Sequence, residues 1–119
     1  MPQLTIAKPF SPSEADFQFA CAAGGITNTT DVVLRAAPPA GQRNHLTSMQ
    51  IKNVNAVATE IVVKDGATVI WRGHCPASML YADMIHFPNP VDAAGALNFA
   101  CLTTGAQVFV SAQGYVGAP

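Results

Sequence analysis

Charged residues are scarce in this chain of 119 amino acids. Asp, Glu, Lys and Arg together make up 11% of it, less than half of the roughly 25% that is usual in globular proteins. Hydrophobic residues make up 50%, a balance that excludes a disordered or charge-solvated chain. The net charge is −1, so no excess of positive charge is present to hold a phosphate backbone, and nucleic acid is not an expected partner.

Long apolar runs and a leader pattern are also missing. No window reaches the roughly 18 consecutive apolar residues of a membrane helix, and Met1–Pro9 lacks a basic start followed by an apolar run. We therefore expect no membrane partner and synthesis in the cytoplasm. Cysteine is rare as well, and the spacing of Cys21, Cys75 and Cys101 matches no zinc pattern. We expect buried, reduced thiols, with a Cys21–Cys101 bridge as the alternative.

No segment keeps a helical period for three turns. Short runs rich in Val, Ile, Thr and Phe instead alternate with Gly, Pro, Asn and Asp, a pattern typical of strands and turns. Strands are predicted at Asp16–Ala22, Asp31–Ala36, His45–Asn53, Val57–Val63, Ala67–Arg72, Met79–Phe87, Ala96–Leu102 and Gln107–Ala112, with Leu4–Ala7 as a further possible pairing segment. The length suits one domain with one core. We therefore predict an all-β protein, a single antiparallel sandwich of about eight strands.

The clearest local pattern is a β-hairpin with Asp65 and Gly66 in its turn. A turn of these two residues alone would pair Lys64 with Ala67 and place Glu60 opposite Trp71. A three-residue loop that starts at Lys64, with Gly66 in the left-handed conformation, instead pairs Val63 with Ala67, Ile61 with Val69 and Thr59 with Trp71. We expect the second register, because it gathers the apolar odd-numbered positions on one face. Trp71 is then an anchor of the core.

The same alternation predicts inward-facing residues on other strands: Met49, Ile51, Leu97, Phe99, Cys101, Val108 and Val110. The run Met79–Phe87 is apolar at both odd and even positions, so both of its faces are expected to be covered. A two-sheet sandwich has few strands of that kind, and a partner subunit is the simple explanation. Pro88 and Pro90 are expected to end this strand.

Residues that often bind metals or act in catalysis form no recognisable pattern. The histidines are His45, His74 and His86. His74 and Cys75 are adjacent, so on a strand they point to opposite faces and could share a metal only from an irregular loop. Among the carboxylates, only Glu14 and Asp16 are close in sequence, and we expect them to solvate the start of a strand. A nucleophile elbow, a Walker loop and a dinucleotide fingerprint are all missing. We expect no enzymatic activity, no cofactor and no metal.

Turn and core residues over about two thirds of the chain form a loosely spaced set. They are Gly41 to Ile51 with Asn53, Asp65-Gly66 with Val69-Ile70-Trp71, Phe87-Pro88 with Pro90, Gly95-Ala96-Leu97, and Gly114-Tyr115. In these residues the chain resembles small virion proteins of tailed bacteriophages, which are similar to the decoration, or cement, proteins on the outside of an icosahedral head. The same small sandwich also occurs in tail tips, head fibres and baseplates.

The resemblance implies a jelly roll or related sandwich that clamps neighbouring major capsid subunits together on the outer surface of the virion, after synthesis in the host cytoplasm. It implies a homo-oligomer, either a trimer or a dimer. We assign residues 1–13 to an extended N-terminal arm that reaches a neighbour, and residues 14–119 to the sandwich. Leu4, Ile6 and Phe10 are then the interface residues of the arm. Tyr81 and Tyr115 are candidate aromatic residues for a subunit interface.

A carbohydrate-binding or receptor-binding module on a virion, such as a tail or head fibre component, is the alternative function. Sandwiches that bind sugars expose an aromatic side chain on a strand face, and Trp71 and Tyr81 are candidates for that role. The polar loop Thr27–Thr30 would supply hydrogen bonds to a glycan.

Overall fold

The computed structural model describes residues 15–119, which form eight β-strands and no helix. The strands are β1 (Ala15–Ala20), β2 (Val32–Arg35), β3 (Arg43–Asn53), β4 (Thr59–Asp65), β5 (Thr68–Cys75), β6 (Asp83–Ala93), β7 (Leu97–Cys101) and β8 (Val108–Gly117). Each of the eight predicted strands overlaps one of these, so the all-β prediction is confirmed. The possible segment Leu4–Ala7 lies outside the described residues.

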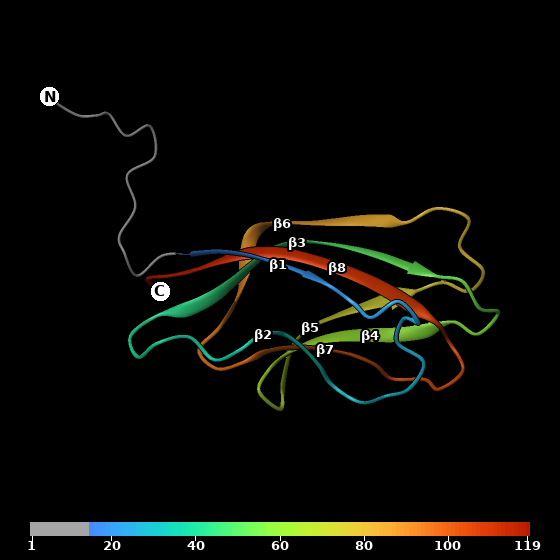
Figure 1. Ribbon diagram of the computed structural model, residues 1–119, viewed down its shortest axis with the longest axis horizontal. Coiled ribbons are helices and arrows are strands. Elements are labelled where there is room, and N and C mark those ends of the chain that lie inside the picture. The colour runs from blue at the N-terminus through green and yellow to red at the C-terminus, as the bar shows by residue number, and fades with distance from the viewer. Residues whose placement is uncertain (1–14) are drawn as a thin grey trace, which may run out of the picture.

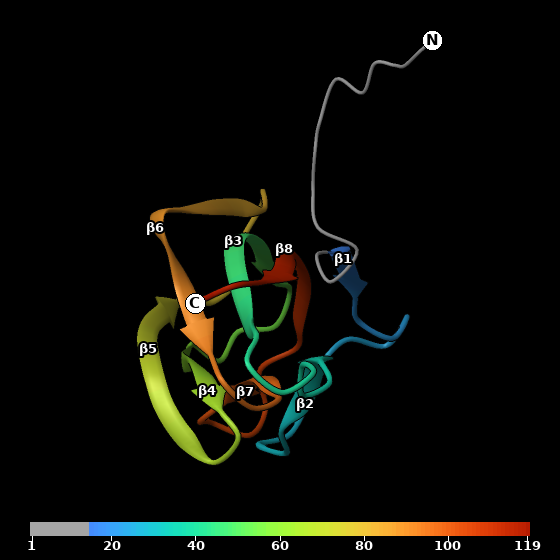
Figure 2. The ribbon, with the colours of Figure 1, turned by 90° about the vertical axis from the view of Figure 1, so that its left-hand side faces the viewer.

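Two four-stranded sheets face each other (Figures 1 and 2), with the strand orders β1-β8-β3-β6 and β2-β7-β4-β5. Every pair of neighbouring strands is antiparallel. Apart from the hairpin β4–β5, each strand is followed by one in the opposite sheet. This is the connectivity of an eight-stranded jelly roll, so the predicted antiparallel sandwich is confirmed.

The core lies between the two sheets. The seven residues predicted to face inwards are all buried, with exposed fractions of 0–1%: Met49, Ile51, Leu97, Phe99, Cys101, Val108 and Val110. They join one cluster with residues of the other strands, including Phe17 of β1 and Leu34 of β2. Alternation along the strands was sufficient to identify this core, because successive side chains of a strand point to opposite faces.

The predicted pairing within the β4–β5 hairpin is wrong. The loop consists of Gly66 and Ala67, so Asp65 pairs with Thr68, and a bulge then shifts the register. As a result Val63 lies opposite Trp71, where the sequence pattern had predicted Ala67. Gly66 does take a left-handed conformation, with φ of 61°.

The predicted end of the sixth strand is also wrong, because β6 begins at Asp83 and continues through both prolines to Ala93. Leu46 of β3 pairs with Val91 and Ser48 pairs with His86, so the four residues 87–90 bulge out opposite a single residue of β3. β6 is an edge strand, where a proline costs no ladder hydrogen bond if its nitrogen faces away from the neighbouring strand.

The sandwich is closed on both sides by side chains from its edge strands. Between β5 and β6, the ring of Trp71 meets the ring of Phe87 edge to face, with the ring centres 5.5 Å apart. Between β1 and β2, the guanidinium of Arg35 lies 5.9 Å from the centre of the Phe17 ring. Trp71 is half-buried and packs against the core cluster.

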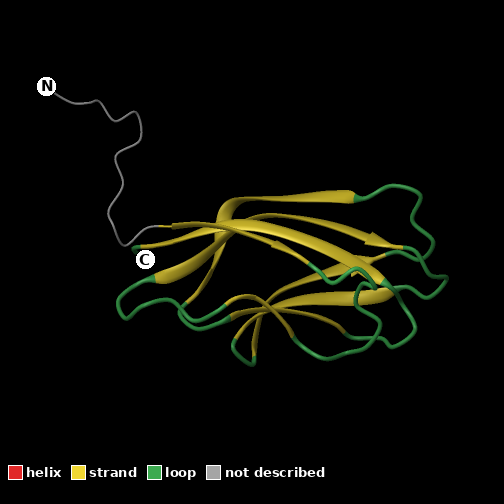
Figure 3. Ribbon diagram, viewed as in Figure 1, coloured by secondary structure: helices red, strands yellow, loops and turns green. Residues whose placement is uncertain are grey.

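Loops gather at the two ends of the long axis (Figure 3). The loops β1–β2, β3–β4, β5–β6 and β7–β8 lie at one end, on the right in Figure 1. The loops β2–β3, β4–β5 and β6–β7 lie at the other end, together with the C-terminus.

Candidate interaction surface

Asn53, the last residue of β3, holds three of the loops at one end together. Its side-chain amide donates to the carbonyl of Val57 at 2.7 Å, and its side-chain oxygen accepts the N–H groups of Asn55 and Gln107 at 3.1 Å each. Its backbone carbonyl accepts the N–H of Met79 at 2.8 Å. The Asn53 side chain is fully buried, so an unmade bond here would leave a buried polar group without a partner. The loops β3–β4, β5–β6 and β7–β8 are therefore built as one unit.

Large apolar side chains are exposed on and beside these loops. Among residues 15–119, eight large apolar residues are exposed, and six of them lie at this end: Val54, Val57, Leu80, Tyr81, Met84 and Leu102. We call these six residues the apolar end. Leu80 and Tyr81 are each 82% exposed, and Met84 is 57% exposed. The segments 54–58, 76–82 and 102–107 contain no charged residue, so a partner could cover these three segments without removing an ion from water. The exposed Asp83 lies beside them, directly before Met84.

The double coverage predicted for Met79–Phe87 does not occur within a single chain. Met79, Ile85 and Phe87 pack against the core, whereas Leu80 and Met84 are exposed. Residues 76–82 form the loop before β6, so the first part of the predicted strand is not a strand. Coverage of the exposed side chains by a partner subunit stays a prediction.

The two tyrosines predicted as interface residues lie at opposite ends of the sandwich. Tyr81 belongs to the apolar end. Tyr115 is half-buried near the C-terminus and stacks on the ring of His45, with the ring centres 4.5 Å apart. They therefore cannot belong to one compact surface.

Asp65 and Gly66 are also at the end opposite the apolar end. The Asp65 carboxylate accepts the N–H groups of Ala94 at 3.2 Å and Gly95 at 2.9 Å. The Gly66 N–H donates to the carbonyl of Ala96 at 2.9 Å. The hairpin tip is thus tied to the β6–β7 loop, a role that a turn pattern in the sequence does not reveal.

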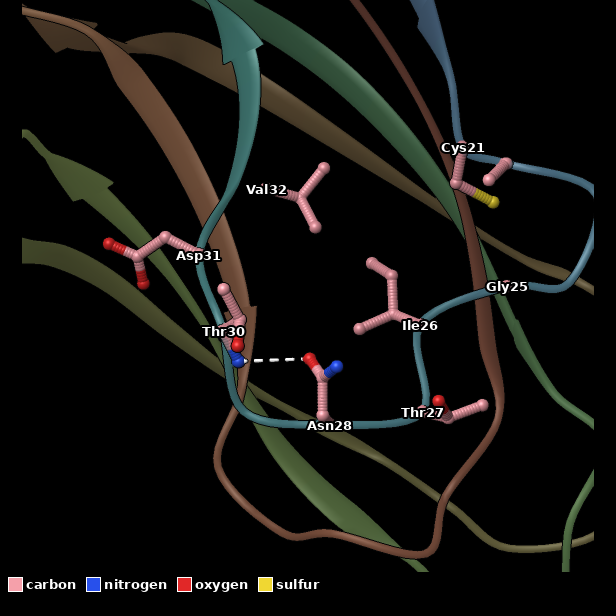
Figure 4. Close-up of a pocket in the computed structure, with 9 residues that line it drawn as sticks. Cys21, Gly25, Ile26, Thr27, Asn28, Thr30, Asp31 and Val32 are labelled. Carbon is pink, nitrogen blue, oxygen red and sulfur yellow. Dashed lines mark hydrogen bonds between the residues drawn. The ribbon is translucent and has the colours of Figure 1, made fainter.

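A pocket of about 270 Å³ opens beside the β1–β2 loop (Figure 4). Cys21, Ile26 and Val32 give it an apolar lining. The predicted polar loop Thr27–Thr30 contributes the rest, and within it the Asn28 side chain accepts the N–H of Thr30 at 3.0 Å.

Trp71 and the loop Thr27–Thr30, two of the three features named for glycan binding, do not come together. The loop Thr27–Thr30 lines the pocket beside β2, whereas Trp71 lies on β5, at the opposite edge of the same sheet. The Trp71 ring is engaged by Phe87, and no aromatic side chain is among the residues that line this pocket. Trp71 and this loop therefore form no shared site, whereas Tyr81, the other aromatic residue named for that role, is 82% exposed. The carbohydrate-binding alternative stays a prediction.

The arm residues Leu4, Ile6 and Phe10 lie outside the described residues, so their assignment to an interface stays a prediction. Glu14 lies outside them as well. Within residues 15–119, no three His, Cys, Asp or Glu side chains come together as a metal site would need. No helix in this part of the chain is long and apolar enough to cross a membrane.

All three cysteines are free thiols, so the alternative of a Cys21–Cys101 bridge is wrong, and Cys75 and Cys101 are fully buried. These two lie on β5 and β7, on either side of β4. Cys75 and Cys101 are two strand spacings of about 4.8 Å apart, roughly 9.6 Å in all. A disulfide can bridge Cα atoms that are at most roughly 7 Å apart, so these two cysteines cannot pair. Burial raises the pKa of both thiols to about 11, with a smaller contribution from Asp83 for Cys75 and from Cys75 for Cys101.

This burial predicts selective alkylation. Because the thiolate is the reactive form, a pKa of about 11 in place of 9.0 lowers its fraction at about pH 8 by roughly a hundredfold. Iodoacetamide should therefore modify the half-buried Cys21 of the folded protein first, and all three cysteines in denaturant, as measured by mass spectrometry of peptides. Equal rates at Cys75 in folded and unfolded protein would contradict the buried position.

Comparisons with known proteins identify no family for this chain. No protein-family model matches the chain, and no curated protein matches it. Among solved structures, it is similar to the cryo-EM structure of the virus-like particle of extra small virus (XSV) of the giant freshwater prawn Macrobrachium rosenbergii. The sequences are 12% identical, the TM-score is 0.43, and the match covers 100% of this chain and 87% of that chain. With so low a score, we draw nothing about function from this likeness.

Proposed function

We propose that this chain is a non-enzymatic structural protein of a bacteriophage virion, which binds the outside of the head and bridges neighbouring major capsid subunits. The observation that carries the proposal is the apolar end: large side chains that are 39–82% exposed, on or beside uncharged loops held by Asn53. Single exposed apolar residues are ordinary, but a group of them on one surface marks a place of contact. The resemblance of Gly41–Tyr115 to phage decoration proteins supplies the class of partner.

The energetics favour a partner that covers the whole apolar end. Burial of one large apolar side chain contributes about 1.5–3 kcal/mol, and part of the sum is offset by the freedom lost on association. Leu80 and Tyr81 are the most exposed residues of the set, so their coverage contributes most. Since Asn53 fixes the loops from inside, little ordering of the backbone is needed when the partner binds.

Stabilisation of a shell requires no chemical reaction. A ligand that binds the assembled lattice and not the free subunits stabilises the assembled state by mass action. Many copies at symmetry-related positions let modest contacts add up over the particle. A homo-oligomer, a trimer or a dimer, would place several apolar ends against the shell at once.

The arm, residues 1–13, is proposed to add contacts with a neighbour through Leu4, Ile6 and Phe10, for example by adding a strand to the edge of its sheet. β1 and β6 are the edges of one sheet and β2 and β5 the edges of the other, so acceptors for such a strand are available. The proposed location is the outer capsid surface, after synthesis in the host cytoplasm.

Deletion of residues 1–13 tests the contribution of the arm. We expect the truncated chain to keep the thermal unfolding midpoint of the full chain and to occupy fewer sites on purified empty heads, as measured by co-sedimentation. The reason is that the deleted residues precede β1, so the sandwich keeps all eight strands. Unchanged occupancy would remove the arm from the proposal and leave the apolar end as the binding surface.

A further inference from the structure

His45 of β3 is buried, with an exposed fraction of 5%, and both of its ring nitrogens face oxygen atoms. Nδ1 lies 2.6 Å from a carboxylate oxygen of Asp92 on β6. Nε2 lies 2.8 Å from the backbone carbonyl oxygen of Ala118, just after β8. Ala118, just after β8, therefore contacts the ring of His45, which lies on the central strand β3.

The Asp92 carboxylate and the Ala118 carbonyl determine how many protons the His45 ring must carry to bind both of them. A carbonyl oxygen can only accept a hydrogen bond, and an ionised carboxylate can only accept as well. A neutral imidazole has one N–H and one lone pair, so with both partners one nitrogen would face an oxygen without a proton between them. With Asp92 ionised, both contacts are hydrogen bonds only when His45 carries a proton on each nitrogen.

Aromatic and charged side chains surround His45. Tyr115 stacks on the ring with an angle of 19° between the two planes. Four residues form a row across the sheet: Asp16 on β1, Tyr115 on β8, His45 on β3 and Asp92 on β6. Arg43, two residues before His45 and so on the same face, is the one positive charge of these neighbours.

We propose that His45, Asp92 and the Ala118 carbonyl form a proton-dependent latch for the segment after β8, Ala118 and Pro119. Below the pH at which His45 gives up its second proton, the segment is held on the sheet. As the pH rises through that point, one hydrogen bond is lost and the segment is released. Because the proton on His45 favours the latched form, the contact between His45 and the segment after β8 weakens as the pH rises. The latch lies at the end opposite the apolar end and does not depend on the proposed function.

Nuclear magnetic resonance of the full chain tests the latch. At about pH 5.5, we expect both ring nitrogens of His45 to carry protons and the Ala118 backbone to be rigid, with an order parameter near 0.85. At about pH 8.5, we expect loss of one ring proton, an Ala118 order parameter below about 0.6, and amide exchange of Ala118 about tenfold faster after correction for the pH dependence of exchange itself. An Ala118 backbone that stays equally rigid after His45 has lost its proton would overturn the proposal.

Two variants separate the latch from a general effect of pH. His45→Gln cannot take up a proton, so Ala118 should be equally mobile at both pH values, whereas His86→Gln, an exposed residue on the same face of the sheet, should behave as the unmodified chain. A pH response that persists in His45→Gln would contradict the latch.

If that variant does not fold, Asp92→Asn keeps the imidazole and removes the neighbouring charge. Release should then occur at lower pH, and an unchanged midpoint would count against the proposal.

Discussion

Replacement of Leu80 and Tyr81 together by serine is expected to weaken binding to empty phage heads by at least a hundredfold, with no loss of folding. Each side chain is 82% exposed in the isolated chain, so the sandwich does not need it. Coverage by the shell would bury both, and at about 1.5–3 kcal/mol for each side chain the loss amounts to roughly 3–6 kcal/mol. Binding isotherms from co-sedimentation measure the effect, and thermal unfolding monitors the fold.

Val33 and Ile70 supply the matched control for this experiment. They are the two remaining large apolar residues that are exposed among residues 15–119, at 52% and 36%, and they lie on β2 and β5, outside the apolar end. Their joint replacement by serine should change head binding by less than about threefold, because isolated exposed apolar residues contribute little. Equal losses in the two double variants would show that binding depends on general hydrophobicity.

Replacement of Gly114 by alanine is expected to prevent folding or to lower the free energy of unfolding by about 4 kcal/mol or more. Gly114 lies in β8, between Phe17 of β1 and Leu46 of β3, at a bulge in the β3–β8 ladder. A Cβ atom there would overlap the carbonyl oxygen of His45 and lie 2.7 Å from the Phe17 ring. The backbone of a central strand cannot move away without the loss of its ladder hydrogen bonds.

Urea unfolding of Gly114→Ala measures this effect, and Gly24→Ala is its control. Gly24 has no atom within 4 Å of the position that a Cβ would take, so we expect its substitution to change stability by less than about 0.5 kcal/mol. A Gly114→Ala protein as stable as the control would mean that β1, β8 and β3 do not approach one another in this register.

The sequence pattern predicted which residues face the core but not which residues pair across the hairpin. Both the predicted and the observed registers place Ile61, Val63 and Trp71 on the same face, since the two differ by four residues, an even number. Alternation therefore cannot distinguish them. The pairing register depends on the bulge within β5 and on the hydrogen bonds of Asp65 and Gly66 to the β6–β7 loop. These bonds join residues about 30 positions apart in the sequence.

The apolar end could be predicted only in part for the same reason. The residue type of Tyr81 predicts an interface role, whereas the pattern places Leu80 in a strand, because a run that is apolar at both odd and even positions is ambiguous between a covered strand and an exposed loop. The bonds of Asn53 that bring three loops together join residues up to 54 positions apart. The only signal in the sequence was the lack of charge in those loops.

His45 shows a similar limit. As one of three histidines it was weighed only as a metal ligand or catalytic residue, and its partners Asp92 and Ala118 are 47 and 73 residues away. Their approach follows from the ladder of β3 with β6 and β8, which strand prediction alone does not supply.

Sedimentation of the purified chain with the major capsid protein of the phage head that we propose it decorates is the most direct test of the proposed function. One sample contains expanded empty heads, and a second contains the same capsid protein as unassembled subunits. We predict that the chain pellets with the heads at a saturating ratio, raises the temperature at which they break up, and does not bind the free subunits. A chain that stays monomeric in the supernatant with both samples would contradict the proposal.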